Sequence, residues 1–148
     1  MSQYRCKYFK IKELVHPDML KNSEDILWLL FDDRILWIAD QVREKYGACT
    51  VNTPTLKDCG LRDITASGAK FSQHKFGRAL DLHIVKIEED ALLQRTKEAI
   101  KEYKVKKYNE IRRELLALYG DKLPINFEDN ISWLHIDVGN RKNNIFNP

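Results

Sequence analysis

Apolar residues recur at helical spacing in the first third of the chain. Ser23 has a side chain that is preferred at a helix N-cap, and Glu24 and Asp25 follow it, where acidic groups are favourable. Apolar residues then recur every three or four positions, at Ile26, Leu27, Leu30, Ile35, Ile38, Ala39 and Val42. This pattern predicts one amphipathic helix that ends at Gly47.

Strict alternation of residue types predicts a strand over residues 78–85. One set of side chains would lie on each face of this strand: Ala79, Asp81 and His83 on one, and Leu80, Leu82 and Ile84 on the other. Shorter strands are predicted at residues 4–14, 48–52, 124–128 and 132–138. The last two would form a hairpin with Asp129 and Asn130 in its turn.

Two long segments lie between the predicted strands. Residues 53–73 are rich in Thr, Gly, Ser and Asp, and a loop of that length in a compact domain is usually functional. Residues 88–119 are charged and helix-favouring, and form either one helix or two before Gly120. The polar tail, residues 139–148, is expected to be irregular. Helices around a few short strands predict an α+β fold with a small antiparallel sheet, in a single domain over residues 1–148.

Composition narrows the class of protein. The 148 residues are 43% hydrophobic and 32% charged, which is typical of a soluble globular protein. No apolar run reaches the roughly 18 residues that cross a membrane, and the N-terminal residues contain no secretory apolar region. The net charge of +3 favours an anionic partner such as a cell wall, but it is too small to indicate nucleic acid. An odd number of cysteines (Cys6, Cys49 and Cys59) predicts reduced thiols.

Histidines and a carboxylate provide candidate metal ligands. The four histidines are His16, His74, His83 and His135. His74 and Asp81 are separated by Gly77, which lets the chain turn so that both side chains reach one ion. His135 lies on the last predicted strand and could meet Asp81 across a sheet. Three such ligands leave a fourth position for water, as in catalytic zinc sites, although a lone histidine on a strand is commonly structural.

Two motifs around these residues resemble a known family. Residues 72–82, SQHKFGRALDL, resemble the SxHxxGxAxD signature of the D-Ala-D-Ala metallopeptidases, which include zinc carboxypeptidases, vancomycin-resistance dipeptidases and phage endolysins. Residues 133–139, WLHIDVG, resemble the second signature, WxH followed by alternating apolar residues, and residues 59–62, CGLR, resemble the SGYR element. The resemblance implies the fold shared with the hedgehog signalling domain, and one zinc ion bound by His74, Asp81 and His135.

The resemblance also implies roles for residues around the ion. Arg62 would hold a substrate carbonyl or carboxylate and stabilise the oxyanion, which suits a forked and permanently charged donor. The alternative for Arg62 is a surface ion pair with Asp63. Ser72 would bind polar groups of the substrate, or its hydroxyl would cap the backbone of its own loop. Gln73, which precedes a metal ligand, would also touch the substrate.

The general base is the least defined part of the predicted site. Many members of the family carry Glu or Asp three residues before the last histidine, where this chain has Ser132. Other members carry the acid near the turn of the final hairpin, and Glu128 is placed for that role. A carboxylate there would move a proton from water to the leaving amine. Asp129 and Asp137 are the alternatives, and a chain without any base would bind zinc without catalysis.

Four further residues each have two interpretations. Asp137 shares a strand face with His135, and either accepts a hydrogen bond that fixes a ligand tautomer or lies on the surface. His83 shares a face with Asp81, and lies either near the site or exposed on its strand. Trp133 forms either a pocket wall or part of the core. His16, before a proline, is expected to be structural or exposed.

Together these observations predict a zinc peptidase that acts on stem or cross-link peptides of peptidoglycan, as an endopeptidase or a D,D-carboxypeptidase. As in phage lysins, it would be made in the cytoplasm without a signal peptide and act at the cell wall after release or as a virion component. We expect a monomer with neither nucleic-acid nor membrane partners. The alternatives are a catalytically inactive, zinc-stabilised binding or virion structural module, and a dipeptide hydrolase of the cytoplasm.

Overall fold

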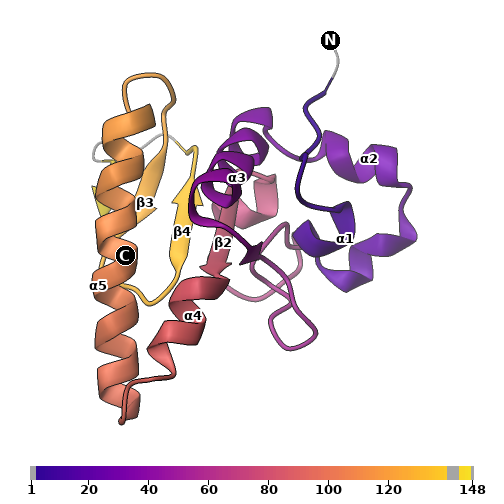
Figure 1. Cartoon of the computed structure of the whole chain (residues 1–148). Coiled ribbons are helices and arrows are strands. Elements are labelled where there is room, and N and C mark those ends of the chain that lie inside the picture. Colours follow the sequence, from indigo (N-terminus) through magenta and orange to yellow (C-terminus); the bar gives the residue numbers. More distant parts are fainter. Residues whose placement is uncertain (1–2, 140–143, 148) are drawn as a thin grey trace.

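The computed structural model describes residues 3–139 and 144–147 and contains both helices and strands (Figure 1). The helices are α1 (Ile11–Leu14), α2 (Glu24–Leu29), α3 (Asp33–Tyr46), α4 (Val85–Ala91) and α5 (Lys97–Tyr119), with the 3-10 helices η1 (Pro17–Lys21) and η2 (Gln73–Phe76). The strands are β1 (Cys49–Thr50), β2 (Ala79–Ile84), β3 (Asn126–Glu128), β4 (Leu134–Asp137) and β5 (Ile145–Phe146). This combination confirms the predicted α+β class. None of the helices in the described ranges is long and apolar enough to cross a membrane.

The strands form a five-stranded sheet in the order β1-β2-β4-β3-β5. All neighbours pair antiparallel except β3 and β5, which are parallel, so the sheet is mostly antiparallel as predicted. The expectation of an irregular tail is wrong at β5, which hydrogen bonds from Phe127 N to Asn144 O (2.7 Å) and from Asp129 N to Phe146 O (2.8 Å) hold to β3. Residues 140–143 and 148 of that tail lie outside the described residues.

The register of the sheet places four polar or aromatic residues in one row. Asp81 of β2 pairs with His135 of β4. The antiparallel pairing of β3 with β4, continued by one residue, brings Glu128 opposite His135. Glu128 in turn pairs with Phe146 of β5. Because directly opposed residues point to the same face of a sheet, these four side chains share one face.

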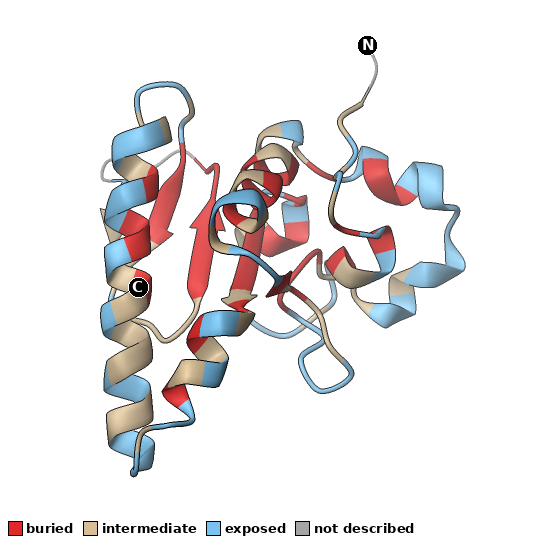
Figure 2. Cartoon of the chain, viewed as in Figure 1, coloured by how far each residue is buried: buried red, intermediate tan, exposed pale blue. Residues whose placement is uncertain are grey.

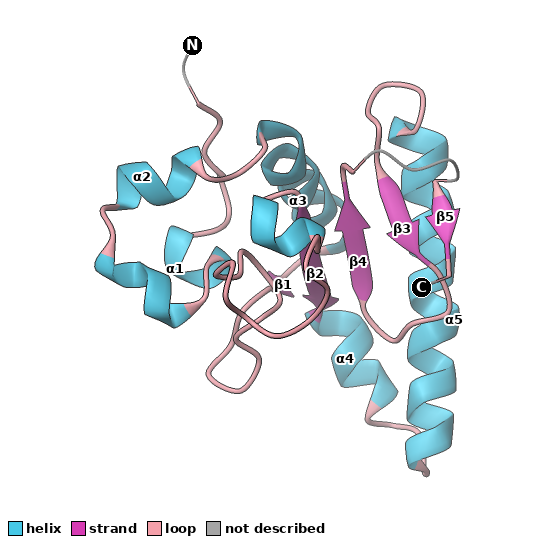
Figure 3. Cartoon of the chain, turned by 180° about the vertical axis from the view of Figure 1, so that it is seen from behind, coloured by secondary structure: helices cyan, strands magenta, loops and turns pink. Residues whose placement is uncertain are grey.

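The other face of the sheet carries the apolar core. The alternate residues of β2, β3 and β4 that point there are fully or almost fully buried: Leu80, Leu82, Ile84, Phe127, Leu134 and Ile136. The buried sides of α3 and α5 lie against this face. Figure 2 shows the buried residues of these helices and of the strands in red. Seen from behind, the strands stand in front of these two helices (Figure 3). The polar side chains of β2, β3 and β4 therefore lie on the face opposite to α3 and α5.

Both long segments predicted to be helical contain a break. The prediction of one helix from Ser23 to Gly47 is wrong, because α2 ends before Asp32 and α3 begins after it. The Asp32 carboxylate accepts a hydrogen bond from Arg34 N (3.0 Å), and its own N–H donates to Gly77 O (2.9 Å). A cap and a tertiary contact thus interrupt a continuous apolar pattern. The second segment forms two helices, one of the alternatives, with Thr96 as the N-cap of α5.

The predicted strand over residues 4–14 is also wrong. The buried carboxylate of Asp40 on α3 accepts hydrogen bonds from Lys7 N (2.7 Å), Tyr8 N (3.1 Å) and the Tyr4 hydroxyl (2.7 Å). The backbone of this segment is therefore satisfied by a side chain rather than by a neighbouring strand. The short helix α1 follows it directly.

Candidate metal centre

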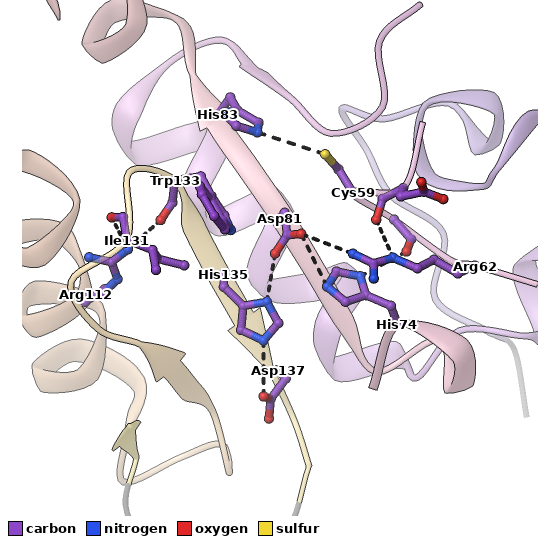
Figure 4. A network of polar contacts seen from close by, with 12 residues as sticks. Cys59, Arg62, His74, Asp81, His83, Arg112, Ile131, Trp133, His135 and Asp137 are labelled. Atoms are coloured by element: carbon purple, nitrogen blue, oxygen red, sulfur yellow. Dashed lines mark hydrogen bonds and ion pairs between the residues drawn. The ribbon is translucent and has the colours of Figure 1, made fainter. Parts of the chain in front are cut away.

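Three potential metal ligands meet on the uncovered face of the sheet. His74 comes from η2, Asp81 from β2 and His135 from β4, and each is at most 9% exposed. One nitrogen or oxygen atom from each residue lies within 4.8 Å of the others. Figure 4 shows the two histidines on either side of the Asp81 carboxylate. This buried group could hold a metal ion.

The backbone orients His74 so that one ring nitrogen faces the centre of the group. Its Nδ1 lies 3.0 Å from Gly60 O, and a carbonyl can only accept, so Nδ1 carries the proton. Nε2 then presents its lone pair near Asp81 Oδ2, at 3.4 Å. Gly60 is required because a Cβ atom there would lie 1.9 Å from Leu14 O. Such a backbone partner is typical of a metal-binding histidine.

Gly77 provides the turn between the first two ligands. Its φ of +63° lies in the left-handed region that favours glycine, and a Cβ atom there would lie 2.0 Å from Leu30 O. The predicted turn at Gly77 is therefore confirmed. It allows η2 to end and β2 to begin two residues later, so that His74 and Asp81 face each other.

Asp137 orients His135 in the complementary way. His135 Nε2 lies 3.3 Å from Asp137 Oδ2, while Nδ1 lies 2.7 Å from Asp81 Oδ1. Asp137 is fully buried and also accepts hydrogen bonds from Asn126 Nδ2 (2.9 Å) and Gly139 N (3.0 Å). The predicted contact of Asp137 with His135 is confirmed, and the interpretation of Asp137 as a surface residue is wrong. His135 would use Nδ1 towards an ion.

The electrostatics of the group favour a cation at its centre. Burial by itself would raise the pKa of Asp81, but its contacts with His135 and His74 outweigh it and lower this pKa well below the ordinary range. Burial would lower the pKa of His135, but its contacts with Asp137 and Asp81 raise it to about 9. Two buried carboxylates thus flank one imidazole, and a buried negative charge requires a cationic partner, which either protonated His135 or a metal ion would provide.

The ligand group opens into a pocket of about 590 Å³ that also contains every other predicted site residue. Its lining includes Arg62, Ser72, Gln73 and Glu128. It also includes residues that the sequence did not indicate, Ala69, Phe71, Phe146 and Asn147, as well as Trp133. The pocket-wall interpretation of Trp133 therefore holds.

Arg62 faces the three potential metal ligands rather than a surface acid. Its Nη2 lies 3.7 Å from Asp81 Oδ2, and its Nε donates to Asp58 O (2.6 Å). Asp63, the alternative partner, instead accepts hydrogen bonds from Thr65 N and its hydroxyl. A guanidinium is thus held at the edge of the pocket with further donors available for a ligand.

The two residues before His74 occupy different environments. Ser72 is the N-cap residue of η2, but its hydroxyl makes no capping hydrogen bond, which argues against the purely structural interpretation. The Gln73 side chain packs beside Gly139, where an added Cβ would come within 2.9 Å of Gln73 Cδ. Its Oε1 is buried without a hydrogen-bond partner among the described residues. Both side chains remain candidates for contact with a ligand.

Of the candidate general bases, Glu128 has the most suitable position. It stands across from His135 in the sheet and lines the same pocket. Asp129, the next residue of the chain, points to the opposite side and lies 3.6 Å from Arg113 of α5. The Asp137 carboxylate already contacts His135 Nε2 and accepts a hydrogen bond from Gly139 N. Glu128 is therefore the carboxylate that remains available next to the ligand group.

His83 and Cys59 form a neighbouring polar contact. Cys59 Sγ lies 4.0 Å from His83 Nε2, and His83 Nδ1 lies 3.5 Å from Glu88 of α4. His83 is therefore near the site and not exposed. Burial raises the pKa of Cys59 to about 11, so this thiol stays neutral, and all three cysteines are free as predicted. His16 accepts a hydrogen bond from Asp18 N and is structural.

Sequence reasoning missed Arg112, which contacts the backbone just before β4, the strand of His135. It is fully buried on α5, and its Nη2 donates to the carbonyls of Ile131 (2.9 Å) and Trp133. Burial lowers the pKa of Arg112 to about 10. The charged composition of residues 88–119 concealed it. The available signal was its spacing with the apolar positions Tyr108, Ile111 and Leu115.

The fold and the site thus define an α+β protein with a buried His-Asp-His group that could bind a metal ion. Comparisons with models of protein families, with curated proteins and with solved structures found no match to this chain.

Proposed function

We propose that the protein is a zinc peptidase that hydrolyses peptide bonds of bacterial peptidoglycan. The observation that carries the proposal is the row across the sheet, in which Glu128 stands beside His135 and Asp81 in one pocket. The resemblance of residues 72–82 and 133–139 to the D-Ala-D-Ala metallopeptidase signatures supports the substrate class. It also supports an origin among phage endolysins or virion-associated lysins.

The donor set of the group fits zinc. Two histidine nitrogens and one carboxylate, with each histidine held by an acceptor on its other nitrogen, are the usual ligands of a catalytic zinc ion. When bound, zinc would supply Lewis-acid chemistry, which polarises a carbonyl and makes water nucleophilic at neutral pH. His74, Asp81 and His135 would hold it.

The protein's own residues would perform the remaining tasks. Glu128 accepts a proton from the attacking water and transfers it to the nitrogen of the scissile peptide bond. A C–O bond to the water oxygen forms first, and the C–N bond breaks once the nitrogen has gained the proton, so that the products are a carboxylate and an amine. Arg62 donates to the oxyanion that develops on the carbonyl oxygen, because its Nη2 lies beside the ligand group, 3.7 Å from Asp81 Oδ2.

The activity is tested by incubating the zinc-loaded protein with purified muropeptides and identifying the products by mass spectrometry. We expect cleavage of one class of peptide bond. Glu128→Gln should lower kcat by about 100-fold or more, because general acid-base catalysis contributes this much. Asp129→Asn is the matched control and should retain activity, since its carboxylate faces Arg113. Equal activity of wild type and Glu128→Gln would show that Glu128 is not the base.

The ligand assignment has a separate test. His135→Ala should lose stoichiometric zinc in elemental analysis, whereas His83→Ala, on the same sheet face, should retain it. Unchanged zinc affinity in His135→Ala would refute the ligand set.

A second candidate function is that of a zinc-stabilised binding or virion structural module without catalysis. Ser132 favours it, because a serine stands where many members of the resembled family carry the acid. This candidate predicts stoichiometric zinc and binding of muropeptides with no product in the same mass-spectrometric assay.

A further inference from the structure

The pocket has two walls, which lie on opposite sides of the metal-binding group. Arg62 and Phe71 belong to the loop that precedes η2, and Arg62 N donates to His74 O (3.2 Å). Glu128 and Phe146 belong to β3 and β5 at the other end of the row. We call these the loop wall and the strand wall. Any extended ligand that crosses the pocket has one end on each wall.

The order of the strands determines the order of the residues across the pocket. From Asp81 on β2 the row passes to His135 on β4, then to Glu128 on β3 and finally to Phe146 on β5. Neighbouring strands are about 4.8 Å apart, so Phe146 lies about three strand spacings, or roughly 14 Å, from the strand of Asp81. Arg62 contacts the Asp81 end of this row.

The chemistry of hydrolysis determines which half of a peptide lies on which wall. The carbonyl carbon gains an oxygen from water, and the nitrogen leaves only after it gains a proton. That proton comes from Glu128, so the nitrogen must lie on the strand wall. The carbonyl oxygen develops negative charge and must lie within reach of Arg62, on the loop wall.

The strand wall carries a carboxylate and an aromatic ring. The Phe146 ring meets the His135 ring edge-on, with centroids 6.1 Å apart and planes at 88°. Two backbone hydrogen bonds to β3 fix its strand, from Phe127 N and Asp129 N. Among the described residues that line the pocket, the one Arg or Lys is Arg62, which lies on the loop wall. The strand wall therefore offers no cationic side chain to a leaving group with a free carboxylate next to its nitrogen, such as a C-terminal alanine. An amine on an uncharged aliphatic stem would pack on the ring and bring its nitrogen to Glu128.

On this basis, which rests on the proposed function, we propose that Phe146 and β5 form the subsite for the leaving amine, and that this amine is an aliphatic side-chain amine as in peptide cross-links. The loop wall with Arg62 and Phe71 binds the acyl half. The enzyme is then an endopeptidase that cuts cross-links rather than a carboxypeptidase that releases a terminal residue.

The two halves can be tested separately as product fragments, without relying on turnover. Nα-acetyl-lysine amide represents the amine half, and N-acetyl-D-alanine represents the acyl half. Their Kd values are measured by NMR titration of the zinc-loaded protein. Phe146→Ala should weaken binding of Nα-acetyl-lysine amide about fivefold, because apolar contact area is lost, and leave N-acetyl-D-alanine unchanged.

Phe71→Ala is the matched control, because Phe71 is 72% exposed on the opposite wall and its removal leaves the core intact. It should weaken only N-acetyl-D-alanine. Phe146→Leu keeps an apolar strand residue and guards against loss of folding, and it should give an intermediate Kd. Equal weakening of both fragments by both variants, the reverse pattern, or no binding of the amine fragment to wild type would overturn the assignment.

A cleavage assay distinguishes failure of this inference from failure of the proposed function. Wild type is offered cross-linked muropeptides and uncross-linked pentapeptides. Cleavage of cross-links alone supports the inference, and release of only the terminal alanine overturns it while the peptidase function stands. No cleavage at all, together with the selective fragment binding above, supports the subsite assignment and rejects the enzyme.

Discussion

The two faces of the central sheet are built from alternate residues of the same strands, yet they have opposite environments. On β3, Phe127 is fully buried among apolar side chains, while the next residue, Glu128, faces the pocket. On β4, Ile136 is buried in the core between His135 and Asp137 on the site face. Neighbouring residues of one strand therefore have different roles: one packs in the core and stabilises the fold, and the next lies on the face of the potential metal ligands.

This comparison shows how a small protein can keep charged groups buried. The core face provides the free energy of folding through apolar burial. On the site face, His74 is satisfied by Gly60 O, His135 by Asp137, and Asp137 by Gly139 N, so the potential metal ligands and their neighbour have local partners. Substitutions on the core face should therefore lower the free energy of unfolding, whereas substitutions on the site face should lower zinc affinity or activity.

The largest effect on stability is expected from Phe127→Ala. Removing a fully buried phenylalanine should lower the free energy of unfolding by about 3–5 kcal/mol, because apolar contacts are lost and a cavity remains. Urea denaturation followed by circular dichroism measures this change. Glu128→Ala, one residue away, should change it by less than about 1 kcal/mol. Similar losses in both variants would refute the division between the faces.

A smaller effect, visible in zinc affinity, is expected from Asp137→Asn. The amide keeps the shape of the carboxylate but loses the charge that orients His135, so zinc affinity should fall about 10–100-fold. Competition with a chromophoric chelator provides the measurement. Asp129→Asn, on the opposite side of the hairpin, should leave the affinity unchanged. If both variants bind zinc like wild type, the role of Asp137 is limited to packing.

The smallest effect concerns the pH dependence of stability. It involves Glu88, whose carboxylate lies 3.5 Å from His83 Nδ1. Burial would raise the pKa of Glu88, but hydrogen bonds from His83, Lys104 and Tyr108 lower it to about 2, from an ordinary value of 4.5. A lowered folded-state pKa gives stabilisation that is present above about pH 4.5 and is lost as pH falls towards 2.

Glu88→Gln should therefore cost about 1–2 kcal/mol at pH 7, after allowance for partial exposure, and less at pH 3. Urea denaturation at the two pH values measures the difference. Glu89→Gln, an exposed neighbour on α4, should be neutral at both. A loss that is independent of pH would indicate packing rather than charge.

The parts of the fold that could be predicted from the sequence are those that depend on local patterns. The strand around Asp81 follows from strict alternation, and its pairing with His135 follows from two motifs with fixed spacing. The ligand group and the lining residues Arg62 and Glu128 were found in this way. Asp81, Glu128 and His135 lie within predicted strands, whereas Arg62 lies in a loop and was found through the resemblance of its motif to that of a known family.

The parts that could not be predicted depend on distant partners. The break before α3 arises because Asp32 N bonds Gly77 O, more than forty residues later. The backbone of Lys7 and Tyr8 is held by hydrogen bonds to the Asp40 carboxylate rather than by a neighbouring strand. Strand β5 has two residues, Ile145–Phe146, which is too short for alternation to register. Long-range hydrogen bonds leave no periodic signal, so local propensity is overridden without warning.

The buried guanidinium of Arg112 has a consequence for the order in which the protein assembles. It binds the carbonyls of Ile131 and Trp133, in the turn between the strands of Glu128 and His135. Until α5 docks, that turn lacks these partners, and the hairpin has no fixed place relative to β2. The contacts of the pocket join residues that are far apart in the chain, and such contacts form late because closing long loops costs entropy. Ligand binding would thus report the completion of folding rather than its beginning.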